Sequence, residues 1–273
     1  MSSYPSSLVL VGAGKMGGAM LEGWLRGGMP GSSVSIIDPR PSDAMQALCV
    51  KAGVAVNPEL DRLAEPAVLL LAVKPQMLDD AAPVLSKLAG ANTLALSVMA
   101  GKTIANMRDR LPRAGAFVRT IPNTPAAVGR GITACYPSAE VSAVQRAQAD
   151  QLLRAIGRVE WVESEDLIDA ATAVSGSGPA YVFYLAEALA KAGAEAGLPP
   201  ELSARLARAT VEGAGELMYQ DASTEPATLR QNVTSPAGTT AAALEVLMAA
   251  DGLQPLMTKA IAAAKRRAGE LSG

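Results

Sequence analysis

The chain has 273 residues, a length that predicts about two domains. Its 24 basic and 26 acidic side chains leave a net charge of −2, which is too small to attract nucleic acid or an anionic membrane, so neither is an expected partner. The chain contains no histidine, which excludes imidazole as an acid, a base or a metal ligand, and we predict no metal site.

The two cysteines, Cys49 and Cys135, are far apart in the sequence and form no C-x-x-C pair. We therefore expect buried thiols and neither a zinc site nor a disulfide framework. The longest uncharged stretch, 170–186, contains glycine, serine and proline, which argue against a membrane span. The N-terminal residues lack the basic region of a secretory signal. Together these features predict a cytoplasmic protein.

Short apolar runs alternate with helical patterns in the first half of the chain. The predicted strands span 8–11, 34–38, 54–56, 68–73, 93–98 and 116–121, with two more at 132–136 and 159–162 that extend the sheet edge. The predicted helices span 16–26, 43–52, 77–88, 104–111 and about 142–155. Strands that are apolar at consecutive positions are typical of a parallel sheet covered by helices on both faces. The pattern predicts a doubly wound α/β domain.

The pattern changes near Ser164, after which only helical periodicity remains. We predict an α/β domain over 1–163 and an all-α domain over 164–273, with Ser164 as the N-cap of the first helix that follows. The first domain carries 16 basic and 13 acidic residues, and the second carries 8 and 13. This difference favours an anionic ligand on the first domain.

The first predicted strand leads directly into G-x-G-x-x-G, and a helix follows. Gly12 permits the tight turn, Gly14 lets the backbone approach a pyrophosphate, and Gly17 allows close packing of helix on strand. The N–H groups of Lys15 and Met16 would then face the phosphates at the start of the helix. This setting favours a dinucleotide site over a purely structural glycine turn.

Asp38 ends the second strand, where a carboxylate commonly binds the ribose 2′-hydroxyl of NAD. Arg40 offers a partner for the 2′-phosphate of NADP instead, and a third interpretation is that Asp38 only forms the turn before Pro39. The sequence leaves both NADP and NAD open as the cofactor.

Two later segments follow strands at the same predicted edge of the sheet. Lys74 comes after the fourth strand in A-V-K-P, and it is either a cofactor contact or a surface lysine. The segment 119–125, RTIPNTP, leaves a later strand in a loop stiffened by two prolines. That loop either positions a ligand or is a purely structural turn.

Two segments of small residues interrupt the helical half. The first, 175–180, is SGSGPA, and its glycines and proline weaken a helix. Close approach of a ligand or of another backbone would explain their presence. The second, 232–240, is NVTSPAGTT and precedes a helix. Hydroxyls and exposed N–H groups at a helix start suit a carboxylate ligand, although N-capping alone is the alternative.

The sequence resembles pyrroline-5-carboxylate reductase, through five segments considered together. They are GAGKMG near the N-terminus, AVKP, PNTPA, SGSGPAYVF and NVTSPAGTT. The last two are the specific ones, because many dehydrogenases share the glycine motif. The resemblance implies a Rossmann dinucleotide-binding domain followed by an all-α dimerisation domain, with homodimers that often assemble into rings such as decamers.

The resemblance also implies the residues of the site. Cofactor contacts are expected from Gly12, Ala13, Gly14, Lys15, Met16, Asp38, Val73, Lys74, Met99, Ala100 and Asn232. The small-molecule substrate is expected at Ser235, Gly238, Thr239 and Thr240, with backbone N–H groups binding its carboxylate and Thr240 approaching the ring nitrogen as the catalytic residue. Ala237 departs from the family pattern, which has glycine there.

The resemblance implies hydride transfer from NADPH or NADH to the cyclic imine, giving proline in the last step of its biosynthesis. Such an acceptor is protonated before the transfer, so the reaction requires no histidine. One alternative is a β-hydroxyacid dehydrogenase, which needs a lysine base, and Lys191 is the candidate. A dinucleotide-sensing protein without catalysis and a structural protein are the others.

Overall fold

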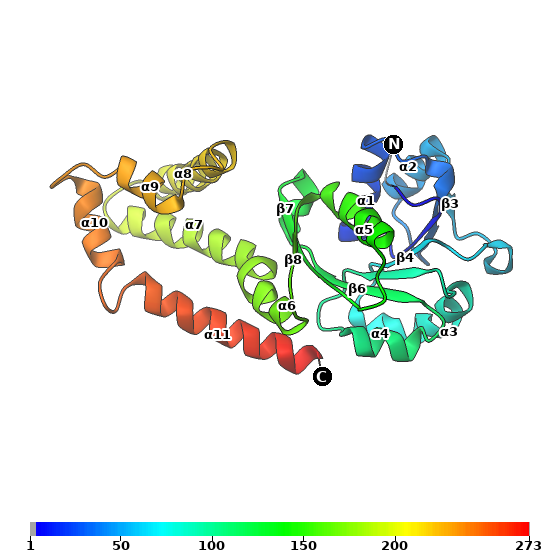
Figure 1. The fold of residues 1–273 in the computed structure, drawn as a ribbon. Helices are drawn as coiled ribbons and strands as arrows, with labels where there is room; N and C mark the ends of the chain where they lie inside the picture. The colour runs from blue at the N-terminus through cyan, green and yellow to red at the C-terminus, as the bar shows by residue number, and fades with distance from the viewer. Residues whose placement is uncertain (1–3, 273) are drawn as a thin grey trace. The chain divides into compact units, whose positions relative to one another are not determined.

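Strands and helices alternate along the first part of the chain, as predicted, in a computed structural model that describes residues 4–272 (Figure 1). The strands are β1 Leu8–Val11, β2 Val34–Ile37, β3 Ala55–Val56, β4 Val68–Leu71, β5 Leu94–Ser97, β6 Ala116–Ile121, β7 Gly131–Pro137 and β8 Gly157–Trp161. The helices between them are α1 Lys15–Arg26, α2 Asp43–Ala52, α3 Leu78–Leu88, α4 Ile104–Arg110 and α5 Ala143–Arg154.

The strands form one sheet in the order β3-β2-β1-β4-β5-β6-β7-β8. Neighbours from β3 through β6 are parallel, so their carboxyl ends lie along one edge. The chain leaves β1 toward β2 on one side and returns to β4 on the other, which creates a crevice at that edge. β7 runs antiparallel to β6, because only the short 3₁₀ turn Thr124–Val128 joins them and a parallel strand needs a longer crossover.

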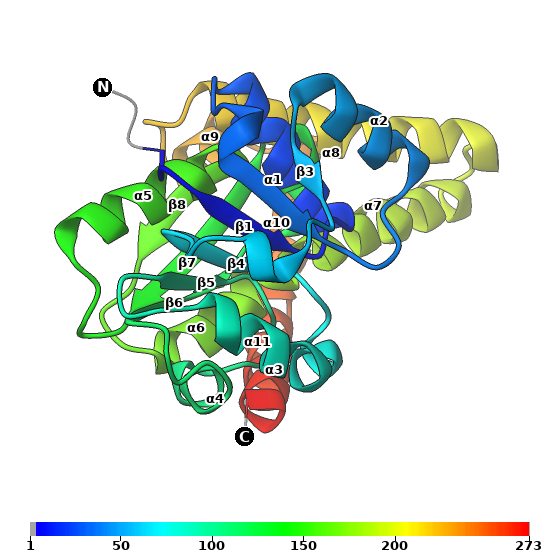
Figure 2. The same cartoon turned by 90° about the vertical axis from the view of Figure 1, so that its right-hand side faces the viewer.

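Helices cover both faces of the sheet, so its central strands are buried throughout. Along β1, Leu8 and Leu10 pack on the face that carries α1, α2 and α5, while Val9 and Val11 pack on the face that carries α3 and α4. Figure 2 shows these two helical layers on opposite sides of the strands. Trp24 is fully buried in the first layer, and its indole N–H donates to the Leu152 carbonyl at 2.8 Å, which joins α1 to α5.

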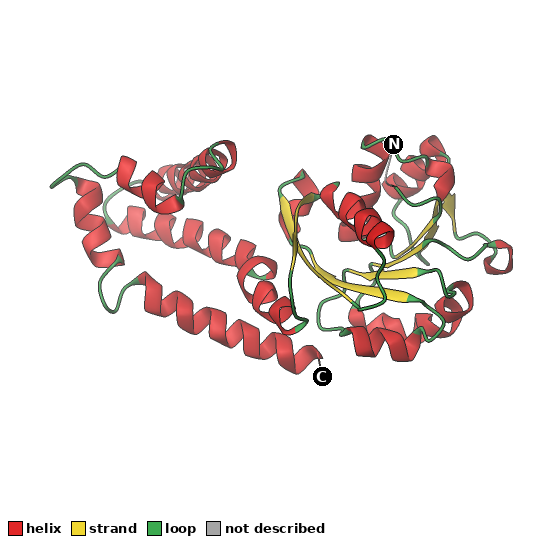
Figure 3. Cartoon of the chain, in the orientation of Figure 1, coloured by secondary structure: helices red, strands yellow, loops and turns green. Residues whose placement is uncertain are grey.

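Only helices follow β8 up to residue 272, as predicted (Figure 3). They are α6 Asp166–Ala171, α7 Gly178–Glu195, α8 Pro200–Gln220, α9 Pro226–Asn232, α10 Thr239–Leu247 and α11 Leu253–Ser272, with a π-helical turn at Thr172–Gly176. In α7, an added Cβ at Gly193 would lie 2.2 Å from the Ser203 hydroxyl of α8, and that hydroxyl donates to the Ala190 carbonyl. This close approach packs α7 on α8.

The prediction that Ser164 caps α6 is wrong. The residue at the N-cap is Glu165, whose backbone is already helical and whose side chain makes no cap hydrogen bond within α6. The Glu165 carboxylate instead accepts from the backbone N–H of Ile104, the first residue of α4, at 2.8 Å. A carboxylate from one helix therefore serves the N-terminus of another.

The chain forms two compact units, and it passes between them twice. The first unit comprises the described residues up to 176 together with 264–272, and the second comprises 177–263. The last turns of α11 therefore belong to the first unit. Within residues 4–272, no helix is both long enough and apolar enough to cross a lipid bilayer.

Both cysteines are free and buried in the first unit. Burial raises the pKa of the Cys49 and Cys135 thiols. The thiolate, which is the form that attacks a disulfide reagent, therefore forms only at a higher pH than it does in an exposed thiol. We expect Ellman's reagent at pH 8 to label neither thiol in the native protein and both after unfolding in guanidinium. Rapid labelling of either thiol in the native protein would contradict their burial.

Candidate functional site

The glycine turn joins β1 to α1 with very little space around two of its glycines. Gly12 has φ +90°, and a Cβ there would lie 2.8 Å from the Ala72 carbonyl oxygen. At Gly17, in the first turns of α1, an added Cβ would lie 2.1 Å from the Gly12 carbonyl oxygen. Both positions require glycine because any side chain would collide with backbone. The roles predicted for these two glycines therefore agree with their surroundings.

Gly14 differs, because no atom lies within 4 Å of the place its Cβ would take. It is the N-cap of α1 and has no side chain that could cap the helix. Among the described residues, the N–H groups of Lys15 and Met16 at the helix start therefore have no hydrogen-bond partner. A pocket of about 530 Å³ lies beside this turn. It is lined by Ala13, Gly14, Lys15, Gly18, Ala19, Glu22, Asp38, Arg40, Ser42, Met45 and Ala127.

Asp38 is held in place from several directions. One carboxylate oxygen accepts from the Ala13 N–H at 2.7 Å and the other from the Arg40 N–H at 2.8 Å. The Asn57 side chain bonds both the N–H and the carbonyl of Asp38, at 2.9 and 2.7 Å. Asp38 therefore fixes the glycine turn against the end of β2, and both it and Arg40 face the pocket.

The other predicted cofactor residues of the first unit follow the neighbouring strands at the same edge. Val73 and Lys74 follow β4, and the exposed Lys74 is the N-cap of a 3₁₀ turn at Pro75–Met77. Met99 and Ala100 follow β5, where the Met99 N–H donates to the Ser97 hydroxyl at 3.2 Å. Because the strands are parallel, the structure brings these residues to one edge with the glycine turn.

The loop with two prolines after β6 is fastened by Asn123. Its amide N–H₂ donates to the Ser175 carbonyl at 3.1 Å, and its amide oxygen accepts from the Ile132 N–H at 3.0 Å. Asn123 therefore links the end of β6 to the start of β7 and to the π-helical turn that precedes α7. These contacts support the structural interpretation of this loop.

The hydroxyl-rich segment lies in the second unit, between α9 and α10. Gly238 caps α10 without a side-chain bond, and an added Cβ there would lie 2.5 Å from the Ser235 hydroxyl. Ala237 has φ +56°, a left-handed conformation that costs a non-glycine residue about 1–2 kcal/mol. The loop thus presents the first N–H groups of α10 without a side-chain cap.

The side chains of this segment are left available. Among the described residues, the hydroxyls of Ser235, Thr239 and Thr240 have no hydrogen-bond partner, whereas that of Thr234 donates to the Arg230 carbonyl at 2.7 Å. Thr240 is half-buried and the other two are exposed. Asn232, the predicted cofactor residue of this unit, is the exposed last residue of α9. Free hydroxyls and N–H groups here suit an anionic group such as a carboxylate.

Lys191 does not have the environment of a catalytic base. Its ammonium pairs with Glu187 of the same helix at 2.8 Å, and its side chain is 70% exposed. The hydrogen bond and the charge of Glu187 raise the pKa of Lys191, so it stays protonated at neutral pH. This observation argues against the hydroxyacid dehydrogenase alternative.

Known proteins match nearly the whole chain. Residues 165–271 match the family described as pyrroline-5-carboxylate reductase dimerisation, and residues 7–101 match the one described as NADP oxidoreductase coenzyme F420-dependent. A pyrroline-5-carboxylate reductase of Pseudomonas aeruginosa is 37% identical over 265 residues, which are 97% of this chain and 96% of the relative.

Solved structures agree with these matches. A pyrroline-5-carboxylate reductase from Coxiella burnetii has a TM-score of 0.89 at 33% identity and covers 98% of this chain and 99% of its own. The pyrroline carboxylate reductase of Plasmodium falciparum, solved with NADP bound, has a TM-score of 0.77 at 25% identity over 98% of both chains. By the extent of these similarities, the chain belongs to the pyrroline-5-carboxylate reductase family.

Proposed function

We propose that this protein reduces L-1-pyrroline-5-carboxylate to L-proline with NADPH or NADH, the last step of proline biosynthesis. The extent of the family match carries the proposal, because it runs through both the glycine turn and the hydroxyl-rich loop. In this proposal, residues 1–163 bind the dinucleotide, and residues 164–273 bind the substrate and form the dimer.

The surroundings of the glycine turn fit a dinucleotide. Gly14 leaves open space where a pyrophosphate needs it, and the uncapped start of α1 offers N–H groups to the phosphates. We assign the cofactor contacts to Gly12, Ala13, Gly14, Lys15, Met16, Asp38, Val73, Lys74, Met99, Ala100 and Asn232. When bound, the reduced nicotinamide supplies the hydride.

The substrate contacts fall to the loop that precedes α10. We assign the carboxylate to backbone N–H groups near Gly238 and Thr239 together with the Ser235 hydroxyl, and the ring nitrogen to the Thr240 hydroxyl. The free hydroxyls and the uncapped helix start support this assignment. The protein contributes mainly position and neutral hydrogen bonds, since the iminium is already a strong electrophile.

The Thr240 assignment predicts a measurable loss. A hydrogen bond to a charged group contributes about 1.5–3 kcal/mol, so Thr240→Ala should lower kcat/KM for the imine by roughly 10- to 150-fold. Thr240→Ser keeps a hydroxyl and should retain most activity. Thr258→Ala, which removes an exposed hydroxyl bonded within α11, is the matched control. Unchanged kinetics for Thr240→Ala, measured as NADPH oxidation at 340 nm, would rule out the assignment.

The pH dependence should belong to the substrate. The chain has no histidine, and the acceptor arrives protonated, so kcat/KM should fall as the pH rises through the pKa of the imine. We expect a substituted imine of different pKa to move this fall by the same amount. A neutral-range pKa that moves with Thr240→Ser but not with the substrate would contradict the proposal.

The dimerisation match and the exposed apolar surface of the second unit together support a homo-oligomer. In residues 177–263, all of which the structure describes, α7, α9 and α10 bury no residue, and Phe183, Leu217 and Val246 are 69%, 64% and 72% exposed. Such apolar surface requires a partner. We propose a homodimer built through this unit, with rings of dimers such as a decamer above it. A cytoplasmic location completes the proposal, supported by the two free thiols.

Light scattering after size exclusion should give at least twice the chain mass of 27.9 kDa. Phe183→Asp places a charge in the apolar surface of α7 and should lower the mass to that of one chain or shift the equilibrium toward it. Val144→Asp changes an equally exposed valine on α5 of the first unit and should leave the mass unchanged. A monomeric wild-type protein would contradict the proposed dimer.

A further inference from the structure

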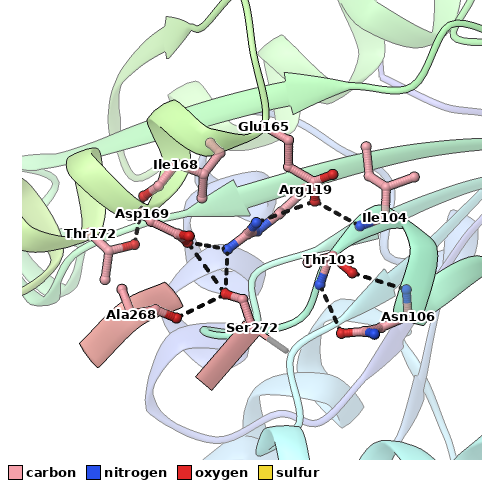
Figure 4. Close-up of polar contacts among 10 residues, drawn as sticks. All are labelled: Thr103, Ile104, Asn106, Arg119, Glu165, Ile168, Asp169, Thr172, Ala268 and Ser272. Atoms are coloured by element: carbon pink, nitrogen blue, oxygen red, sulfur yellow. Dashed lines mark hydrogen bonds and ion pairs between the residues drawn. The ribbon is translucent and has the colours of Figure 1, made fainter. Parts of the chain in front are cut away.

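A buried arginine stands in the middle of β6, a strand whose six residues are all buried. Arg119 of β6 is 3% exposed, and its guanidinium pairs with the carboxylates of Glu165 at 3.2 Å and Asp169 at 2.7 Å (Figure 4). The same guanidinium donates to the Ser272 hydroxyl at 3.1 Å. A charge so deeply buried needs partners of this kind, because isolated burial of a guanidinium is very unfavourable.

The three partners of Arg119 come from the two segments that connect the compact units. Glu165 and Asp169 belong to the start of α6, which leads through the π-helical turn to the first crossing after residue 176. Ser272 ends α11, which returns to the first unit at residue 264. One side chain of the sheet therefore fastens both connections to the first unit.

The same cluster reaches the turn after β5 that we assign to the cofactor. The Glu165 carboxylate accepts from the N–H of Ile104, which begins α4 four positions after Ala100. Leu271 lies against Gly101, where an added Cβ would be 2.9 Å from the Leu271 carbonyl oxygen. Gly101 follows Ala100 immediately, so the turn is held on one side by α6 and on the other by the end of α11.

Removing the guanidinium would release these contacts together. Glu165 and Asp169 are only 27% and 18% exposed, and without Arg119 their two negative charges would face each other in a poorly hydrated site. Ser272 would lose the donor that links the end of α11 to the sheet, because its remaining bonds run to Ala268 and Asp169. Repulsion between the carboxylates would move α6 and with it the bond to Ile104.

From this arrangement we infer that Arg119 is a positioning residue for the Met99–Ala100 turn. It acts through Glu165 and through the Asp169–Ser272 contacts at the end of α11. This inference depends on the proposed function for the meaning of that turn. Most of the assigned cofactor contacts belong to the glycine turn and the pocket beside it, which lie outside the cluster. Displacing the Met99–Ala100 turn should therefore lower the rate of hydride transfer more than the affinity for the dinucleotide.

The test compares wild type with Arg119→Gln, Arg119→Lys and Ser272→Ala. Displacements of about 1 Å at a reacting centre can lower a rate by about 10²-fold, so we expect kcat of Arg119→Gln to fall 10- to 100-fold. Its Kd for NADPH, measured by NADPH fluorescence, should stay within about threefold of wild type. Arg119→Lys keeps the positive charge but lacks the planar guanidinium, so its kcat should lie between those of wild type and Arg119→Gln.

A second measurement needs no turnover. Hydrogen exchange of the backbone amides of residues 98–104 should accelerate in Arg119→Gln, and more weakly in Ser272→Ala, while the amides of α1 keep their wild-type rates. Ser272→Ala removes only one of the contacts, so it provides the test if Arg119→Gln fails to fold. The matched control is Arg267→Gln, which breaks an exposed ion pair with Glu270 in the same terminal turns.

The outcomes separate the two proposals. The wild-type rate on pyrroline-5-carboxylate tests the function, whereas exchange at residues 98–104 tests the positioning whatever the substrate is. A folded Arg119→Gln with kcat within twofold of wild type and unchanged exchange at 98–104 would overturn the inference. So would equal effects from Arg267→Gln, since a nonspecific loss of stability would then explain both variants.

Discussion

The close packing of α1 on β1 determines where the first unit can bind a ligand. With no side chain at Gly17, the helix comes close enough for its backbone to meet the Gly12 carbonyl, and the helix N-terminus then points its free N–H groups at the edge of the sheet. Asp38 bonds the Ala13 N–H and keeps this turn against β2. The dinucleotide contacts assigned within the first unit depend on that geometry, because the neighbouring strands are parallel and end beside it.

A chain without histidine has to bind polar ligands with groups that keep the same charge near neutral pH. Here these are backbone N–H groups at two helix starts, the hydroxyls of the loop before α10 and a few ion pairs. None of them exchanges protons near pH 7, which suits an acceptor that carries its own proton. The same groups give the protein little scope for reactions that need a general base, and the ion-paired Lys191 illustrates this.

Much of the first unit was predictable because local pattern and tertiary packing agree there. The runs at β1 and β4 are apolar at every position, and burial on both faces follows directly from that. The antiparallel direction of β7 follows from the short connection after Asn123 and not from the composition of the strand, so the apolar pattern alone did not indicate it. The cap of α6 was predicted wrongly because Glu165 bonds to Ile104, a partner 61 positions away. Arg119 was visible as a charge inside a predicted strand, but its partners lie in segments far away in the sequence that no local pattern connects to it.

The return of α11 to the first unit also bears on how the protein is made. Ser272 lies against Arg119 of β6, 153 positions earlier in the sequence, so this contact of the first unit forms only after the whole helical segment between them has been synthesised. An N-terminal domain that folds by itself during synthesis can complete its core early. In this protein the sheet is synthesised early, yet the buried guanidinium of Arg119 and the partly buried carboxylates of α6 complete their hydrogen bonds only once α11 has been made.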